Sequence, residues 1–377
     1  MSTTWPPKNP TTSRAIGRRQ FLRLLLTPIA GTFVGDPLLT SLLADRHLLA
    51  EAAELSREAV TIDLHCHANP LAAKDFPAVK GQLAGQLAAN MKAGGVDAGL
   101  FAIRGDLGTI RTDASGQRIE HRPAKPGELF RRAQEQLTPL IKATQSGQLA
   151  LATTPGEILA AKKRATPAAI LALEGSDPLE GDLARGKFFH ERGVRVMQLL
   201  HYRINEIGDI QTAAPRHNGL TPFGRELVAE LNRLGMVIDT AHASSTTLDG
   251  VLAASRAPVI FSHTAPRVQR ANSRRLEDDD IKAIAKHGGV IGIWPTLGSR
   301  DSFETFLKRL DYMKQLVGAD HFGVASDLFG LRGRTALPTH REFPLLPAGL
   351  LKRGYSESDT EKIVGANFMR LFREVTA

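Results

Sequence analysis

A single cysteine, Cys66, is present among the 377 residues of the sequence. One thiol cannot form a disulfide within the chain, so the fold must be stabilised by its buried core. A cluster of thiolates, which many structural zinc sites use, is also excluded. Side chains alternate along a strand, so Cys66 is expected to point away from its two histidine neighbours and into the apolar core. A metal centre would therefore depend on imidazole and carboxylate ligands.

Long apolar runs, internal repeats, low-complexity tracts and interdomain linkers are missing as well. The N-terminal apolar run in residues 17–35 is broken by Arg23, Pro28 and Gly31, and it is too short to cross a bilayer as a helix. The composition, 42% hydrophobic and 23% charged, is that of an ordinary globular protein and fits no disordered class. We predict one folded domain over 55–377, preceded by an N-terminal segment over 1–50.

The positive charge of the chain is also too small to indicate that the protein binds nucleic acid. The formal charge is +9, but the first 50 residues hold six basic and two acidic side chains and so carry +4 of it. About +5 remains for the body of the chain. No nucleic-acid partner is predicted.

The N-terminal segment places Arg18 and Arg19 directly before the interrupted apolar run. This pattern resembles a twin-arginine export signal, which predicts recognition by the bacterial export machinery and a periplasmic or exported protein. An organellar transit peptide and a disordered basic tail are the alternatives. No clear cleavage site stands out between Gly35 and Ala50, so a retained leader that tethers the protein to the membrane stays open.

Short apolar runs alternate with amphipathic helical segments along the rest of the chain. This alternation indicates βαβ units with parallel strands, and eight runs favour an α/β fold of the closed (β/α)8 TIM-barrel type over an open doubly wound sheet. The eight predicted strands are 61–65, 98–103, 169–174, 194–201, 236–241, 258–262, 289–294 and 321–326.

Helix signals and one long connection complete the prediction. Thr221 and Pro222 are typical of a helix start, and Gly235 ends that helix. The connection over 104–150 is unusually long, and we predict that it holds a helix over 127–143 and a loop over the barrel mouth.

The first strand ends in two histidines, His65 and His67. Residues i and i+2 of a strand share one face, so both imidazoles can reach one metal ion. Histidines also end strands for packing reasons, and this pair alone leaves both interpretations open.

Titratable side chains close most of the predicted strands, and their common placement favours a metal centre. Barrel enzymes build their sites at the C-terminal ends of the strands, where these side chains should converge. The residues that close the strands are His65, His67, Glu174, His201, His242, His263 and Asp327. Imidazole and carboxylate donors suit Zn²⁺ or a similar divalent ion. The donors outnumber the ligands of one tetrahedral ion, so we predict two ions per chain bridged by Glu174, a shared hydroxide and a hydrolytic reaction in which Asp327 transfers the proton.

Several stretches together resemble the membrane (renal) dipeptidase family of zinc peptidases, peptidase family M19, over about 60–375. They are Leu-Glu-Gly (173–175), Gly-Leu-Thr-Pro-Phe-Gly-Arg-Glu-Leu (219–227), Asn-Arg-Leu-Gly-Met-Val-Ile-Asp-Thr-Ala-His-Ala-Ser (232–244), Ala-Pro-Val-Ile-Phe-Ser-His (257–263), Arg274 with Asp278-Asp279, Gly-Gly-Val (288–290), Ser-Asp-Leu-Phe-Gly (326–330), Arg-Gly-Tyr-Ser-Glu (353–357) and Gly-Ala-Asn-Phe (365–368).

The resemblance implies roles for single residues. The metal positions of the family fall on His65, His67, Glu174, His242 and His263, and its substrate and proton-transfer positions fall on His201, Arg274 and Asp327. His201 would steady the oxyanion, and Arg274 would hold the terminal carboxylate of a small peptide substrate. Because family members are often dimers, a homodimer is also compatible with the resemblance.

Two departures from the family pattern stand out. His67 occupies a position where the family usually has aspartate, which removes one negative charge from the expected binuclear site. Phe329 replaces a common acidic residue. The expected function is a zinc-dependent dipeptidase. The alternatives are a related binuclear amide or lactone hydrolase acting in secondary-metabolite maturation, and a degenerate barrel that binds a ligand without turnover.

Overall fold

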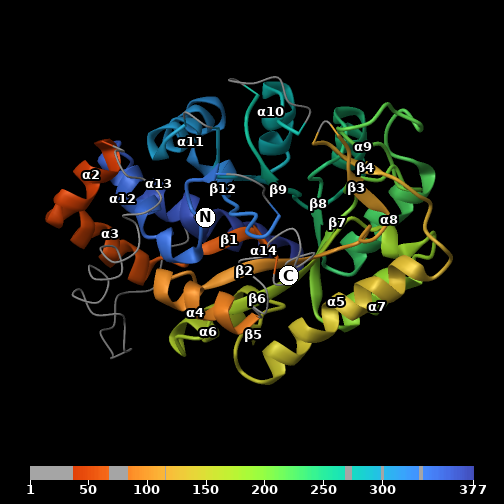
Figure 1. Ribbon diagram of the computed structural model, residues 1–377, viewed down its shortest axis with the longest axis horizontal. Helices are drawn as coiled ribbons and strands as arrows, with labels where there is room; N and C mark the ends of the chain where they lie inside the picture. Colours follow the sequence, from red (N-terminus) through yellow and green to blue (C-terminus); the bar gives the residue numbers. More distant parts are fainter. Residues whose placement is uncertain (1–36, 68–83, 115, 268–273, 299–300, 331–333) are drawn as a thin grey trace.

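The computed structural model describes residues 37–67, 84–114, 116–267, 274–298, 301–330 and 334–377 (Figure 1). Its centre is a parallel sheet with the strand order β1-β2-β6-β7-β8-β9-β10-β12. The strands are β1 (Ile62–Cys66), β2 (Ala98–Arg104), β6 (Ala168–Glu174), β7 (Val194–Gln198), β8 (Val237–Asp239), β9 (Ile260–Thr264), β10 (Val290–Ile293) and β12 (Phe322–Val324), and the short β5 (Ala150–Leu151) pairs with β6. Each of the eight lies within a few residues of a predicted strand.

The sheet closes into a barrel where β1 meets the chain that follows β12. The Asp327 N–H donates a hydrogen bond to the His65 carbonyl oxygen at 2.8 Å, and the His67 N–H donates one to the Leu328 carbonyl oxygen at 3.1 Å. The first and last strands are thereby joined, which confirms the (β/α)8 prediction over the open sheet. This joint also brings Asp327 to the rim that carries the two histidines.

Helices cover the outside of the barrel (Figure 1). They are α4 (Ala84–Gly94), α5 (Glu128–Gln145), α6 (Pro155–Lys163), α7 (Ala184–Glu191), α8 (Pro222–Arg233), α9 (Ser245–Ala254), α10 (Asp278–Lys286), α11 (Phe303–Val317), α12 (Leu345–Lys352) and α13 (Glu357–Glu361). The predicted start of α8 is confirmed, because the Thr221 hydroxyl oxygen accepts a hydrogen bond from the Gly224 N–H at 3.0 Å.

A hydrophobic cluster fills the barrel and extends to its closing helix. Small and branched residues of the strands form it, among them Ala98, Leu100, Ala102, Ala168, Ile170, Ala172, Val237, Ile260 and Val290. Phe368 and Phe372 of α14 (Asn367–Thr376) belong to the same cluster, and α14 contacts β8, β10 and β12. Most of these strand residues lie toward the N-terminal ends of their strands. The opposite, C-terminal rim is therefore the end at which a site can form.

The long connection over 104–150 contains α5, as predicted, and a hairpin of β3 (Ile110–Thr112) and β4 (Arg118–Glu120). The Arg118 guanidinium lies 5.6 Å from the centre of the Tyr202 ring and donates a hydrogen bond to the Gly330 carbonyl oxygen at 3.5 Å. Both partners lie in loops that follow strands of the barrel. The predicted cover over the barrel mouth is therefore present.

The chain before the barrel is helical where the structure describes it. Helices α2 (Pro37–Ala44) and α3 (Arg46–Glu58) pack against α12, so residues 37–50 of the predicted leader contact the folded body. The paired arginines lie outside the described residues, and export remains a prediction. Among the described residues, no helix combines the length and the apolar character needed to span a bilayer.

Candidate metal centre

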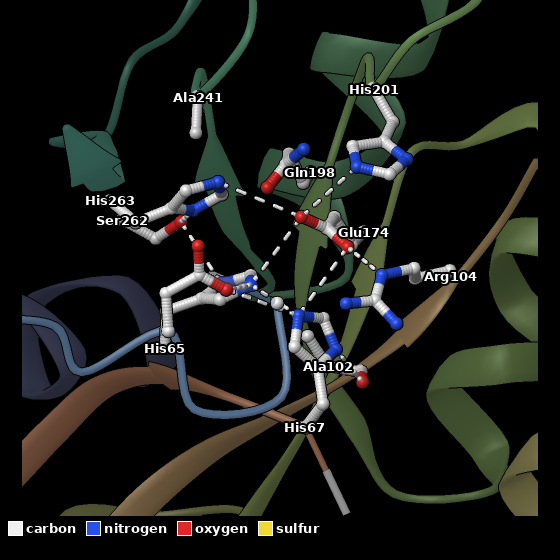
Figure 2. Close-up of polar contacts among 12 residues, drawn as sticks. His65, His67, Ala102, Arg104, Glu174, Gln198, His201, Ala241, Ser262 and His263 are labelled. Atoms are coloured by element: carbon white, nitrogen blue, oxygen red, sulfur yellow. Dashed lines mark hydrogen bonds and ion pairs between the residues drawn. The ribbon is translucent and has the colours of Figure 1, made fainter. Parts of the chain in front are cut away.

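Side chains from four strand ends converge at the C-terminal rim (Figure 2). His65 and His67 come from the end of β1, Glu174 ends β6, His242 follows β8, and His263 lies in β9. All five side chains are buried. The structure thus brings together the five residues that the sequence predicts as metal ligands.

Glu174 stands between two groups of imidazoles. On one side, its Oε1 lies 3.5 Å from His65 Nε2 and its Oε2 lies 3.7 Å from His67 Nε2. On the other side, Oε1 lies 3.8 Å from His242 Nε2 and 3.6 Å from His263 Nε2. Each group, His65–His67–Glu174 and Glu174–His242–His263, holds its donor atoms within 4.8 Å of one another. The two imidazole nitrogens are 3.2 Å apart in the first group and 3.0 Å apart in the second. Donor atoms 3.0 to 3.8 Å apart can share an ion at ordinary Zn–N and Zn–O distances of about 2 Å.

The charge state of the imidazoles suits metal binding. Burial lowers the pKa of His67 to about 4, with the Arg104 guanidinium adding to the effect. Burial also holds the pKa values of His242 and His263 well below the usual histidine range. These three rings are therefore neutral near pH 7, and a neutral imidazole is the form that binds a metal.

Contacts behind the rings fix their orientation. The His67 Nδ1 lies 2.9 Å from the Ala102 carbonyl oxygen, which can only accept, so Nδ1 carries the proton and Nε2 presents its lone pair to the site. The Ser262 hydroxyl lies 3.3 Å from His65 Nδ1 and 2.9 Å from His263 Nδ1. One hydroxyl thus supports a ring from each group.

His201 lies outside its predicted strand, because β7 ends at Gln198 and not at residue 201. Its ring nevertheless reaches the centre, with Nε2 3.4 Å from Glu174 Oε1. Its Nδ1 lies 2.8 Å from Oδ1 of Asp106, whose Oδ2 accepts a hydrogen bond from the Tyr202 N–H at 3.1 Å. Asp106 is fully buried and was missed from the sequence. Its place two residues after β2 was the available signal.

Arg274 is buried beside the centre. Its Nη1 donates a hydrogen bond to Gln211 Oε1, and its guanidinium lies 5.4 Å from the centre of the Trp294 ring. The imidazoles of His242 and His263 feel its positive charge, which contributes to their lowered pKa values. Arg274 is therefore placed to meet an anionic group of a molecule bound at the rim.

Asp327 lies next to two of the predicted metal ligands, although the sequence analysis assigned it to proton transfer and not to metal binding. Its Oδ1 is 3.4 Å from His67 Nε2 and 4.0 Å from His65 Nε2. Its φ of 46° is in the left-handed region, as is the φ of 71° at His242. Residues other than glycine rarely adopt this conformation, and it is often found where a site constrains the backbone.

Arg104 is a second residue that the sequence prediction missed. It ends β2 one residue beyond the predicted strand, and in the parallel register it pairs with Glu174. Its Nε lies 3.3 Å from Glu174 Oε2, and its Nη2 donates a hydrogen bond to the Phe329 carbonyl oxygen at 3.0 Å. The side chain is only 2% exposed. A fixed positive charge therefore lies within the centre itself.

The donor groups fit a divalent ion. The Oε1 of Glu174 lies 3.4 to 3.8 Å from the Nε2 atoms of His65, His201, His242 and His263. A buried carboxylate oxygen among imidazole nitrogens is costly unless a cation completes its surroundings. The set of neutral imidazoles and carboxylates is one that zinc and similar ions prefer.

Comparisons with known proteins agree with the barrel and identify a family. Residues 49–377 match the family model of membrane dipeptidases, peptidase family M19. Dipeptidase tcpJ of Claviceps purpurea is 33% identical over 216 residues, which are 55% of this chain and 51% of that protein. Dipeptidase 3 of Rattus norvegicus is 32% identical over 219 residues, 55% of this chain and 45% of that protein. The chain spans about half the length of the curated relatives it matches.

Solved structures share the fold. A metallo peptidase from Rhodobacter sphaeroides, liganded with a phosphinate mimic of the dipeptide L-Ala-D-Ala, has a TM-score of 0.71 and 22% identity, covering 84% of this chain and 100% of that one. An amidohydrolase from Pseudomonas aeruginosa has a TM-score of 0.72 and 24% identity, covering 86% of this chain and 98% of that one. Because the family match extends over nearly the whole barrel and includes every residue of the centre, the chain belongs to the membrane dipeptidase family, peptidase family M19.

Proposed function

We propose that the protein is a zinc-dependent dipeptidase that hydrolyses small dipeptides. The observation that carries the proposal is the Glu174 carboxylate between two groups of buried imidazoles at a barrel rim, with Arg274 beside it. A divalent ion held there would supply Lewis-acid polarisation of the scissile carbonyl and lower the pKa of a water molecule. Both groups together offer the two-ion arrangement expected from the sequence.

The residues around the centre supply binding and proton transfer. The Arg274 guanidinium can hold the terminal carboxylate of a dipeptide in a two-pronged ion pair. In its doubly protonated form, with Nδ1–H donating to Asp106, His201 can donate a hydrogen bond from Nε2 to the oxyanion that develops from the carbonyl. Asp327 at the rim can accept a proton from the attacking water and pass it to the leaving amine.

The size of the substrate follows from the cover over the barrel mouth. The β3–β4 hairpin contacts Tyr202 and Gly330 at the barrel mouth, and we propose that this cover restricts the site to a short substrate. The phosphinate mimic of L-Ala-D-Ala bound to the Rhodobacter sphaeroides peptidase supports a dipeptide of small residues.

A panel of dipeptides with free and amidated C-termini tests the proposal. A dipeptidase should hydrolyse the free peptides, lose activity on the amides because Arg274 has no carboxylate to bind, and lose activity with a chelator until zinc is returned. Arg274→Met should raise KM for free dipeptides much more than for amides. Turnover of lactones or blocked amides with no turnover of free dipeptides would favour the related amide or lactone hydrolase, and metal-free protein without turnover would favour the ligand-binding barrel.

We also propose that the N-terminal segment directs export through the twin-arginine pathway. The paired Arg18 and Arg19 before an interrupted apolar run support this. A reporter fused to residues 1–50 should reach the bacterial periplasm, and changing both arginines to lysine should keep it in the cytoplasm. Light scattering of the purified protein would test whether it forms the homodimer that its family suggests.

A further inference from the structure

The two groups of imidazoles around Glu174 differ in their electrostatic surroundings. On the His242–His263 side, the nearest fixed positive charge is Arg274, which also contacts Gln211 and Trp294 at the edge of the centre. On the His65–His67 side, the Arg104 guanidinium touches the bridging carboxylate itself, with 3.3 Å between its Nε and Glu174 Oε2. The same oxygen is the one that faces His67 Nε2, at 3.7 Å. A cation on this side would share its carboxylate oxygen with a guanidinium.

Arg104 cannot easily withdraw from this position. It is buried, its Nη2 is held by the Phe329 carbonyl oxygen, and its Cα is fixed opposite Glu174 by the β2–β6 register. A guanidinium keeps its proton in proteins, so it cannot remove its charge by titrating. It is a permanent cation at the centre.

The count of buried charges favours one divalent ion. Leaving the imidazoles aside, three buried carboxylates (Glu174, Asp327 and Asp106) and two buried guanidinium groups (Arg104 and Arg274) carry a net charge of −1. One divalent ion changes this to +1, and a second ion changes it to +3. Burying an uncompensated charge is strongly unfavourable, and each further charge costs more than the last.

We infer that the two groups bind metal unequally, with one ion retained by Glu174, His242 and His263, and the His65–His67 side occupied only at high metal concentration because Arg104 serves there as the built-in positive charge. Three protein ligands and one open position are the usual coordination of a catalytic zinc. The inference rests on the metal site of the proposed function. The sequence led us to expect two ions per chain and marked His67 as the departure at one of them.

Metal content of the full-length protein tests the inference directly. After purification without chelator and removal of loosely bound ions by gel filtration, inductively coupled plasma mass spectrometry should find one zinc per wild-type chain. Titration with zinc against a chromophoric chelator should find a second dissociation constant at least about 100-fold weaker than the first, because a like charge a few ångströms away repels the second ion. Arg104→Met should strengthen the second site by about 10-fold, which is part of the difference, and His67→Asp should raise the retained zinc above one per chain.

Arg118→Met is the matched control, because Arg118 lies at the same barrel mouth but contacts Gly330 and Tyr202 instead of Glu174. It should leave both dissociation constants unchanged. Two tightly retained ions in the wild type would overturn the inference, as would a second dissociation constant that neither Arg104→Met nor His67→Asp changes. If Arg104→Met fails to fold by circular dichroism, His67→Asp alone decides. Dipeptide turnover, measured on the same samples, reports on the proposed function separately, since ions can be counted whether or not the protein hydrolyses dipeptides.

Discussion

Replacing Asp106 by asparagine should reduce turnover without removing the metal. Asp106 contacts no predicted ligand, but its Oδ1 lies 2.8 Å from His201 Nδ1 and its Oδ2 accepts a hydrogen bond from the Tyr202 N–H at 3.1 Å. The pair is buried, so the carboxylate fixes both the tautomer of the His201 ring and the direction of its Nε2. An asparagine of nearly the same shape keeps the packing but loses the charge.

The size of the effect follows from the kind of hydrogen bond that is lost. A hydrogen bond to a charged group contributes about 1.5–3 kcal/mol. If His201 uses this bond mainly when it stabilises the transition state, kcat/KM should fall by about 10- to 150-fold, and the fall should be mostly in kcat. KM should change little, because the proposed function places the dipeptide carboxylate at Arg274 and not at His201.

Steady-state kinetics on a free dipeptide, with zinc content and circular dichroism measured on the same preparation, checks this prediction. Asp182→Asn is the control, since its carboxylate is exposed on the far side of the loop that follows Asp177. An Asp106→Asn enzyme within twofold of the wild type would refute the positioning role. A loss of activity that tracked a loss of zinc would refute it as well, because Asp106 would then act on metal binding.

Two further predictions concern stability. Asp63 is fully buried. Its Oδ1 accepts a hydrogen bond from the Ser326 N–H at 2.8 Å, and its Oδ2 lies 2.7 Å from His340 Nε2. Asp63→Ala should lower the free energy of unfolding by about 3–5 kcal/mol, measured by urea denaturation, and a change below about 1 kcal/mol would contradict this structural role. Burial and the nearby Asp106 raise the pKa of Asp177 to about 8, above its unfolded value, so its contribution is complete below the unfolded pKa and is lost as the pH rises toward 8. The stability of the wild type should therefore fall more between pH 5 and pH 8 than that of Asp177→Asn, and equal pH dependence would contradict the raised pKa.

The barrel could be predicted because the chain repeats one simple pattern. Eight apolar runs separated by amphipathic helices leave few arrangements open, and the rule that parallel strands need helical crossovers selects the barrel. The ends of strands were harder to place. The run over 194–201 is buried except for the half-buried Arg195, and burial continues in the loop that carries His201. The apolar pattern therefore did not reveal that β7 ends at Gln198.

The part of the centre that could be predicted consists of residue types that commonly bind metals. Histidines and a glutamate at strand ends indicate a metal site, and the structure brings them together. Arg104 carries no such signal, and the place of Asp106 two residues after β2 is a weak one, since arginine and aspartate at a strand end usually lie in solvent or cap a helix. Their meaning depends on which strands are neighbours and in what register, and a single sequence does not contain that information.

The two unusual features of the His65–His67 side are linked through one strand. Strand β2 ends in Arg104, which lies opposite Glu174, and two residues earlier its Ala102 carbonyl oxygen accepts the His67 Nδ1 proton. β2 therefore places a guanidinium beside the bridging carboxylate and also holds a neutral imidazole where the family usually has an anion. Both features make this side more positive, and both raise the free energy of a second cation there. A change at His67 or at Arg104 alone should thus recover only part of the second site, and full recovery should need the anion restored and the guanidinium removed together.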